Sequence, residues 1–457
     1  MTSVSFWFEQ LGGMPEPRPP LEGRVEADVC VVGGGYTGLW TAYELRRSDP
    51  SLEVVVLERE VAGFGASGRN GGWVLGAVSG SRAGWIERGG REGALALERA
   101  IQATVDEVGR VVDAEGIDCD FVKGGTLVVA QSELELDRLR AQHADDRELG
   151  LADEDGVLLD AEALADRVHV RGGVGGLFSP HCARVQPAKL VRGLAEAVEH
   201  RGATIHEQTP VLAIEPGRAR SAAGEVRARW IVRATEGYTA NLPGLRRTLA
   251  PVNSAMIATE PISADAWREL GWDRCETMLD GRRLYTYLQR TADGRIALGG
   301  RGVPYLYGSR TAREEAPPPE TIEGLRRRLR DLFGPAADTG VAGAWQGVLG
   351  VSRTWRPAVG IDPAQGLAWG GGYAGEGVAA SNLAGRTLRD LLLGADTELT
   401  RLPWVGPPER AWEPEPLRYA GIHAVHKLMR AADRAERRTG KPSRLGEVAV
   451  AISGRGH

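Results

Sequence analysis

The sequence predicts an α/β protein in which a Rossmann-type nucleotide-binding domain carries an inserted antiparallel β-sheet domain. A buried strand, a glycine turn and a helix follow one another near the start of the chain, and the same order returns near its end in "GLAWGGGYAGEGVAASNLAGRTLRDLLLG". Short alternating segments rich in β-forming residues lie between these two regions. Because strand–turn–helix units stand on both sides of the β-rich part, we expect the nucleotide-binding domain to be discontinuous.

The first β-α-β unit is the clearest element of this pattern. Val29–Val32 is a short continuous apolar run, typical of a strand buried on both faces. A glycine turn follows, Thr37–Arg47 has helical spacing, and Val54–Leu57 is a second buried strand. The unit takes about 30 residues, the usual length of a β-α-β motif. The inner face expected for its helix consists of Leu39, Ala42, Tyr43 and Leu45.

Further along the chain, helical patterns alternate with strand patterns. Helices are expected at Arg91–Gly116, Ser132–Leu149 and Ala188–Arg201, and a glycine-broken strand pair at Phe121–Ala130. From Pro251 to Arg301 the segments are short and partly alternating, which predicts an antiparallel sheet. The expected domains are an N-terminal extension (1–26), the nucleotide-binding domain (27–85, 150–250 and 340–398), the substrate domain (86–149 and 251–339) and a C-terminal helical tail (399–457).

The tail is predicted to contain one more helix, at about Pro416–Arg438. One side of this helix is an apolar stripe and the other side is basic. Such a helix packs on its own protein, on a partner or on a membrane surface, and all three remain open from the sequence. The stripe consists of Leu417, Ile422, Val425, Leu428, Met429 and Ala432.

Composition limits the class of protein. With 457 residues the chain is long enough for about two or three domains. Its net charge of −5 argues against general nucleic-acid binding, which usually requires a basic surface. The N-terminus lacks a signal-peptide pattern, and no apolar run approaches the roughly 20 residues of a membrane span. The four cysteines are scattered, so we expect no metal site, no disulfide framework and a cytoplasmic location.

Gly33, Gly35 and Gly38 form a G-x-G-x-x-G motif between the first strand and its helix. The first glycine allows the tight turn, the second lets a pyrophosphate approach the backbone, and the third lets the helix pack on the strand. Glu58 ends the second strand about 20 residues later, where an acidic residue accepts ribose hydroxyls. The sequence therefore predicts dinucleotide binding.

A second glycine-rich stretch, "GFGASGRNGG", follows directly after Glu58. An NAD-binding domain does not need a second such loop, whereas FAD, which is longer, can use one. Ser67, Asn70 and the amides of Gly71 and Gly72 are candidates to bind pyrophosphate or the flavin edge. Arg69 is the candidate to neutralise charge.

Five segments in order resemble one enzyme family: "VVGGGYTGLWTAYEL", "GFGASGRNGG", "IVRATEGYT", "DGRIALGGRG" and "GGGYAGEGVAASNLAGR". They are similar to the glycine oxidase/D-amino acid oxidase (DAO) type of FAD-dependent amine oxidoreductases, and most similar to the γ-glutamylputrescine oxidase-like branch. The resemblance covers about residues 25–395 and implies a GR2-like FAD-binding fold. Some related branches bind flavin covalently through a cysteine, at a position that aligns with Leu349. None of the four cysteines lies near it, so we expect non-covalent FAD.

The resemblance also assigns cofactor-binding positions. Gly33–Gly38 and Glu58 would hold the ADP half, Val211 would meet adenine through its backbone, and Gly372–Val378 would reach the flavin ring. A helix beginning there would point its N-terminus at the anionic end of reduced flavin. The complete set of candidates is Gly33, Gly35, Tyr36, Thr37, Gly38, Glu58, Arg59, Ala66, Ser67, Arg69, Asn70, Gly71, Gly72, Val211, Ala234, Thr235, Gly350, Gly372, Gly375, Gly377 and Val378.

The same resemblance bears on the substrate. In the glycine oxidase pattern one carboxylate-binding arginine aligns with Leu349 and another falls in the turn Ala374–Glu376. In the sarcosine oxidase pattern a lysine aligns with Ala379. Because an unpaired carboxylate in a dry site is costly, the loss of these cations favours an amine over an α-amino acid. Arg301 or Arg353 would be the alternative carboxylate contact.

The reaction implied by the family is hydride transfer from the carbon next to nitrogen to flavin N5. The imine would hydrolyse to an aldehyde, and O2 would reoxidise the flavin to give H2O2. His181 is a candidate proton acceptor and Glu376 a candidate to attract a cationic group; a structural role is the alternative for His181. The remaining candidates, Tyr285, Tyr287 and Arg301, lie on the inserted sheet, where the alternative is cross-strand packing.

Four other interpretations remain at this stage. A flavin dehydrogenase would pass electrons to a carrier rather than to O2, and no sequence feature separates it from an oxidase. An NAD-linked dehydrogenase would use only the first β-α-β unit and would leave the later glycine turns unexplained. A nucleic-acid-modifying flavoprotein is disfavoured by the acidic charge balance. A protein that binds flavin without catalysis is the fourth.

Overall fold

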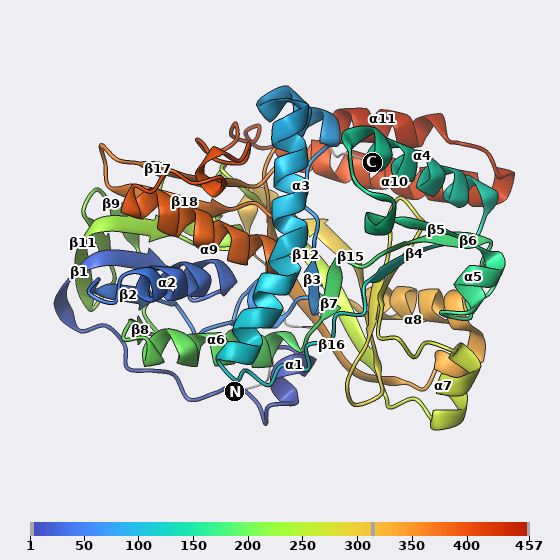
Figure 1. Ribbon diagram of the computed structural model, residues 1–457, viewed down its shortest axis with the longest axis horizontal. Coiled ribbons are helices and arrows are strands. Elements are labelled where there is room, and N and C mark those ends of the chain that lie inside the picture. The colour runs from blue at the N-terminus through green and yellow to red at the C-terminus, as the bar shows by residue number, and fades with distance from the viewer. Residues whose placement is uncertain (1–3, 312–315, 455–457) are drawn as a thin grey trace.

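The computed structural model describes residues 4–311 and 316–454, without the side chains of residues 301–304. Two large sheets lie side by side, one in an α/β part and one in a second part (Figure 1). A small third sheet of β3 (Trp73–Leu75) and β7 (Cys182–Arg184) lies between them in the view of Figure 1. This architecture agrees with the predicted combination of a Rossmann-type domain and a second sheet domain.

The first sheet has the order β17–β18–β11–β1–β2–β8, with β10 beside β11 and β9 beside β10. Its central strands are parallel, and β17 pairs antiparallel at the edge. The inner four residues of β1 are buried because β2 and β11 flank them and helices cover the sheet. The strands are β1 (Gly23–Val32), β2 (Val54–Leu57), β8 (Thr204–His206), β9 (Ala213–Glu215), β10 (Arg218–Arg220), β11 (Gly224–Arg233), β17 (Ala358–Asp362) and β18 (Leu367–Gly371).

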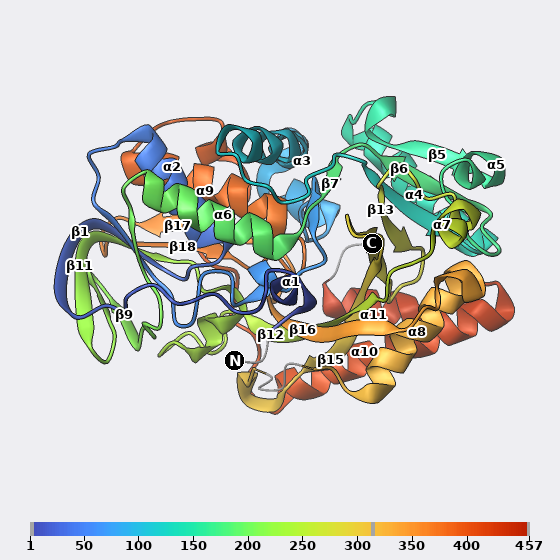
Figure 2. The same cartoon turned by 90° about the horizontal axis from the view of Figure 1, so that it is seen from below.

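Helices α2, α6 and α9 lie on one face of this sheet, and α3 packs on α9 (Figure 2). The helix after the first glycine turn, α2, packs against α9 so closely that a Cβ on Gly385 would lie 2.8 Å from the Trp40 backbone. The inner face predicted for α2 is buried as expected. The helices are α2 (Tyr36–Ser48), α3 (Arg82–Ala114), α6 (Pro187–His200) and α9 (Gly377–Leu393).

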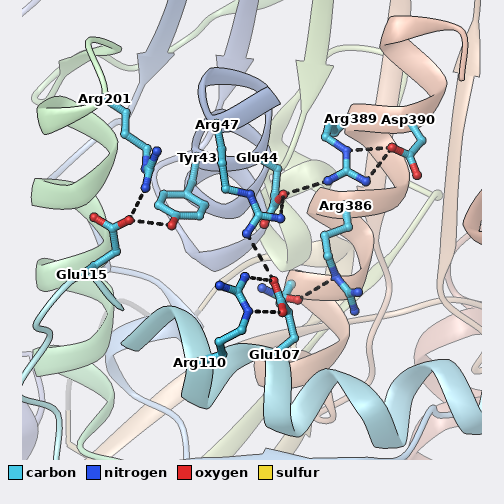
Figure 3. A network of polar contacts seen from close by, with 11 residues as sticks. Tyr43, Glu44, Arg47, Glu107, Arg110, Glu115, Arg201, Arg386, Arg389 and Asp390 are labelled. Atoms are coloured by element: carbon cyan, nitrogen blue, oxygen red, sulfur yellow. Dashed lines mark hydrogen bonds and ion pairs between the residues drawn. The ribbon is translucent and has the colours of Figure 1, made fainter. Parts of the chain in front are cut away.

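Charged side chains join these helices where they meet (Figure 3). Glu44 of α2 is ion-paired with Arg47 at 2.8 Å and with Arg389 of α9 at 3.0 Å. Arg47 also reaches Glu107 of α3 at 3.3 Å. The Tyr43 hydroxyl donates to Glu115, which also pairs with Arg201. Buried carboxylates are therefore paired here, as burial of charge requires.

The second sheet has the order β16–β12–β15–β14–β13–β4–β6–β5. All of its pairings are antiparallel except that of β4 with β13. The predicted antiparallel sheet is thus present, with one parallel pair. The strands are β4 (Thr126–Ala130), β5 (Val157–Asp160), β6 (Gly175–Ser179), β12 (Ala250–Thr259), β13 (Thr277–Asp280), β14 (Tyr287–Arg290), β15 (Ile296–Tyr305) and β16 (Val341–Val351).

Strand pairing differs from the expected division of the chain in two places. β5 and β6 were expected in the nucleotide-binding part, but they extend the second sheet through β4. β16 was also expected there, but it pairs along its length with β12. Both errors have one cause, since a buried strand has the same local sequence in either sheet. The strand pair expected at Phe121–Ala130 is the single strand β4.

Helices also pack around the second sheet and at the termini. Phe6, Trp7 and Phe8 of α1 are buried against Trp345 and the first part of α6, so the expected N-terminal extension contributes to the core. The C-terminal helices α10 and α11 pack on each other, and α10 packs on β15. No helix in the described ranges is long and apolar enough to span a bilayer. These helices are α1 (Phe6–Glu9), α4 (Glu133–Leu149), α5 (Ala161–Ala165), α7 (Ala264–Leu270), α8 (Pro319–Phe333), α10 (Leu417–Thr439) and α11 (Arg444–Ser453).

Candidate cofactor and active site

A cavity opens at the carboxyl ends of four parallel strands of the first sheet. Gly33 follows β1, Glu58 follows β2, Ala234 follows β11, and the turn after β18 supplies Tyr373. Val348 and Leu349 of β16 close the cavity from the second sheet. Ligands of open α/β sheets bind at this edge, outside the carboxyl ends of the strands.

Most of the predicted cofactor-binding residues line this one cavity. They come from five separate segments, which the fold brings together at the strand ends. The predicted residues that line it are Gly33, Gly35, Tyr36, Thr37, Glu58, Arg59, Ala66, Ser67, Asn70, Val211, Ala234, Thr235, Gly375, Gly377 and Val378. The predicted residues that do not line it are Gly38, Arg69, Gly71, Gly72, Gly350 and Gly372.

The first glycine turn is built for close backbone approach. Gly33 has φ +115°, and a Cβ there would lie 2.4 Å from the Ala234 carbonyl oxygen. A Cβ on Gly38 would lie 1.9 Å from the Gly33 carbonyl oxygen, so this glycine serves helix packing. Gly35, the residue before α2, has no side chain to cap the helix; Ser67 Oγ accepts from Tyr36 N instead, and Gly35, Tyr36 and Thr37 all line the cavity.

Glu58 is held by backbone amides at the end of β2. Its carboxylate accepts from Gly34 N at 2.7 Å and from Glu60 N at 3.0 Å. Burial raises the pKa of Glu58, and these two N–H groups oppose that rise. Arg59 stacks on the ring of Tyr238, 5.1 Å from its centroid, and both line the cavity.

The second glycine-rich loop is held mainly by its own polar groups. Asn70 Nδ2 donates to the carbonyl of Ser67 at 2.8 Å, and Asn70 Oδ1 accepts from Gly72 N at 2.7 Å. Ser67 Oγ accepts from Tyr36 N at 2.9 Å, at the first residue of α2. Arg69 Nε donates to the carbonyl of Phe64 at 2.7 Å, and its guanidinium lies over the Phe64 ring. Arg69 therefore holds the backbone of this loop, whereas it was predicted to neutralise the charge of the cofactor.

Three donors from distant segments hold consecutive carbonyls of this loop. Ser5 Oγ donates to Gly68 O at 2.7 Å, and Trp345 Nε1 donates to Arg69 O at 2.8 Å. Trp7 Nε1 donates to Asn70 O at 2.9 Å. No local pattern in the sequence predicts this support; its one trace is the aromatic cluster "FWF" in a polar N-terminal segment.

Glu236 is a cavity-lining acidic residue that was not among the predicted site residues. It lines the cavity with φ +43° and accepts from Gly372 N at 2.8 Å and Tyr373 N at 3.2 Å. A further N–H, that of Gly350, also faces it. Burial raises the pKa of Glu236 to about 7, against the opposing effect of these N–H groups. In the sequence, Glu236 is the acidic residue directly after Ala234 and Thr235, which were both predicted to bind the cofactor.

Tyr287 and Tyr285 lie near the second loop and the second sheet. Tyr287 of β14 donates to or accepts from Ser254 Oγ at 2.9 Å, and its ring packs over Gly299 of the neighbouring strand. A Cβ on Gly71 would lie 2.8 Å from the same ring. Tyr285 precedes β14. Neither tyrosine lines the cavity described above.

His181 lies outside the cavity, in the turn between β6 and β7. Its Nε2 is 2.7 Å from Asp155 Oδ1. Burial would raise the pKa of Asp155, but its bonds to His181 and to Ala152 N lower it below the usual value. His181 is therefore held by Asp155. It lies apart from the residues that line the cavity.

The other charged candidates are dispersed. Arg301 lies in β15, and its side chain is outside the described part of the chain. Arg353 pairs with Glu413 at 2.9 Å and stacks on Trp412. Glu376 is the residue directly before α9. It lies near Glu98, whose pKa is raised to about 7 by burial and by nearby acids that include Glu376.

The cavity fits a dinucleotide with a flavin end. At one end Glu58 lies beside the glycine turn and the start of α2, which suit a ribose and a pyrophosphate. At the other end the start of α9 and the apolar side chains of Val348 and Leu349 form the wall. A polar end joined to an apolar end with a helix N-terminus matches the two halves of FAD.

Comparison with known proteins agrees with this geometry. Residues 28–391 match the family described as DAO, FAD dependent oxidoreductase. The chain is 31% identical to γ-glutamylputrescine oxidoreductase of Escherichia coli K12, over 83% of this chain and 86% of that protein. It is 30% identical to the probable oxidoreductase OrdL of Haemophilus influenzae, over 84% and 86%.

Solved structures show the same fold. Glycine oxidase from Geobacillus kaustophilus superposes with a TM-score of 0.69 at 19% identity, covering 82% of this chain and 96% of that chain. L-proline dehydrogenase from P. horikoshii gives 0.68 at 18% identity, covering 83% and 98%. At these identities the likeness establishes the architecture of the two sheets.

Proposed function

Because this chain belongs to the DAO family of FAD-dependent oxidoreductases, we propose that it oxidises a primary or secondary amine with O2 as the electron acceptor. The carbon next to nitrogen loses a hydride and the nitrogen loses a proton, which leaves an imine. Water then converts the imine to an aldehyde and the released amine, and O2 takes up two electrons and two protons to give H2O2. Bound FAD supplies the two-electron acceptor for the hydride.

The observation that carries the proposal is the lack of a cation at the flavin end of the cavity. Among the described residues that line it, Arg59 is the single cation, and it stands next to Glu58 at the other end. Leu349 and Gly375 line the cavity, and Ala379 is buried in α9. An α-amino acid carboxylate would have no partner among these groups, whereas an amine needs none.

The chain's own residues have defined tasks in this proposal. Glu58 accepts the ribose hydroxyls, and the amides at the start of α2 face the pyrophosphate. Val348, Leu349 and Tyr373 form a wall that excludes water from the flavin end. The N-terminus of α9 favours negative charge there. We further propose the reducing cytoplasm as the site of action, because the four cysteines are scattered along the sequence.

The test is anaerobic bleaching of the visible flavin absorbance by a panel of compounds. The panel contains putrescine, γ-glutamylputrescine, other mono- and diamines, glycine, sarcosine and D-amino acids. We expect bleaching by at least one amine and none by glycine or D-amino acids. Bleaching by the amino acids alone would refute the proposal. Peroxide release after air is admitted separates an oxidase from a dehydrogenase that uses a carrier.

A further inference from the structure

The outward face of α10 is a stripe of basic side chains. Five exposed residues recur at helical spacing over three turns, and none has a hydrogen bond or ion pair within the described chain. They are Lys427, Arg430, Arg434, Arg437 and Arg438. Unpaired cations gathered on one face of one helix attract an anionic surface.

The acidic residues of α10 point the other way, into the protein. Asp433 accepts from Arg283 N at 3.1 Å and from Leu284 N at 3.2 Å. Glu436 pairs with Arg283 at 3.0 Å and with Arg138 of α4. These contacts hold the acidic side of α10 against the loops of the second sheet. The basic side of the helix therefore faces solvent.

The neighbouring helix α11 adds an apolar stripe. Leu445, Val448 and Ile452 follow at i, i+3 and i+7 and are 44%, 48% and 52% exposed. The other face of α11, with Gly446 and Ala449, is buried. Large aliphatic side chains in a row seldom remain in water without a partner.

Positive charge also flanks this apolar stripe. Lys441 and Arg444 are exposed in the turn and first residue that lead into α11, and Glu447 is the single exposed acid in the described part of α10 and α11. The whole chain has a net charge of −5, so the basic character is local to this helix pair. Basic residues beside exposed aliphatic residues are the composition of helices that lie in a membrane interface.

We propose that the α10–α11 helix pair docks on the surface of an anionic lipid bilayer. The basic stripe would meet lipid phosphates, and the aliphatic stripe of α11 would enter the headgroup region. A nucleic acid would use the cations but leave Leu445, Val448 and Ile452 in water. No residue of α10 or α11 lines the cavity, so this proposal does not depend on the amine reaction.

Vesicle flotation of the purified, FAD-loaded full-length protein tests the proposal. One set of vesicles contains phosphatidylcholine alone, and the other also contains phosphatidylglycerol. We expect about tenfold more protein on the anionic vesicles, and a loss of most of that excess at high salt. Equal recovery on both sets, or no recovery on either, would overturn the proposal.

Paired substitutions locate the contact. Arg430→Glu with Arg434→Glu is expected to reduce recovery on anionic vesicles about tenfold, and Val448→Ser with Ile452→Ser several-fold. Arg91→Glu with Arg229→Glu makes the same charge change at exposed sites elsewhere and is expected to leave recovery unchanged. The bound flavin absorbance and the Tm of each variant verify folding without relying on the amine reaction. An equal loss in the control, or binding of RNA or an acidic protein in place of vesicles, would refute lipid docking.

Discussion

Glu236 connects three segments whose ends form the cavity wall. Its carboxylate follows β11 and accepts N–H groups from Gly372 and Tyr373 after β18, and from Gly350 in β16. Tyr373 in turn reaches Thr37 of α2, since their hydroxyls are 3.0 Å apart. A single side chain thus links the edge of the first sheet to the second sheet, although it need not touch substrate.

Glu236→Gln is expected to weaken FAD binding about tenfold. Glutamine keeps the size of the side chain, but its NH2 group would face an N–H donor that the carboxylate now satisfies. Losing a charge-assisted hydrogen bond of this kind costs about 1.5–3 kcal/mol, part of which relaxation of the loop recovers. The Kd for FAD by quenching of flavin fluorescence measures the effect, with the surface change Glu215→Gln as control. Unchanged affinity would mean that the segments after β11 and β18 keep their positions without the Glu236 carboxylate.

The pKa of Glu236 predicts the pH dependence of the FAD-free protein. The folded value of about 7 lies above the ordinary value of 4.5, so between these pH values the folded chain binds more protons than the unfolded chain. This group therefore contributes stability at low pH that is lost as the pH rises toward about 7. The difference in Tm between wild type and Glu236→Gln should become less favourable to wild type from pH 5 to pH 8. A difference that grows with pH would contradict the assignment.

At the scale of elements, the short N-terminal helix supports the second glycine-rich loop, which lines the cavity. α1 is too short to be stable alone, and its aromatic residues are buried against β16 and α6. Its donors, together with Trp345, hold the carbonyls of Gly68, Arg69 and Asn70. The loop that lines the cavity is therefore held in shape by residues more than 60 positions earlier in the chain or more than 270 later.

Trp7→Phe tests this support, because it removes the indole N–H and keeps most of the buried ring. We expect a loss of about 1 kcal/mol of stability and a several-fold weaker Kd for FAD. Trp412→Phe is the matched control: its indole also donates to a carbonyl, that of Val351, but outside this loop. It should lower stability similarly and leave the Kd nearer to wild type. Equal effects of the two changes on FAD would show that α1 stabilises the whole protein and not the loop.

Local patterns in the sequence predicted the elements well, and tertiary contacts account for what they missed. The turn at Gly33–Gly38 and the acid at Glu58 stand in one short segment, so spacing alone was enough to find them. Glu236 and Trp7 act through partners far away in sequence, which no local pattern records. Arg69 was expected to meet the cofactor's charge, because a sequence cannot show that nearby carbonyls are its acceptors.

At the scale of the whole molecule, the substrate end of the cavity exists only where the two sheets meet. Leu349 comes from β16 of the second sheet, yet it faces residues that follow β11 and β18 of the first. Under the proposed function, the side chain at this position would set which chemical group can stand opposite the flavin end. Some strands of the second sheet were assigned to the nucleotide-binding domain, because long-range contacts decide which sheet a strand joins.

Leu349→Arg is expected to shift preference from amines toward amino acids. A guanidinium at the apolar end of the cavity would pair with a carboxylate and repel a cationic amine. We expect the ratio of kcat/KM for glycine or sarcosine to that for the best amine to rise about tenfold or more. Leu349→Met keeps the volume without the charge and should leave that ratio near the wild-type value. If the arginine variant still binds FAD but its ratio is unchanged, the substrate's polar group does not lie against β16, and the selection against carboxylates arises elsewhere in the cavity.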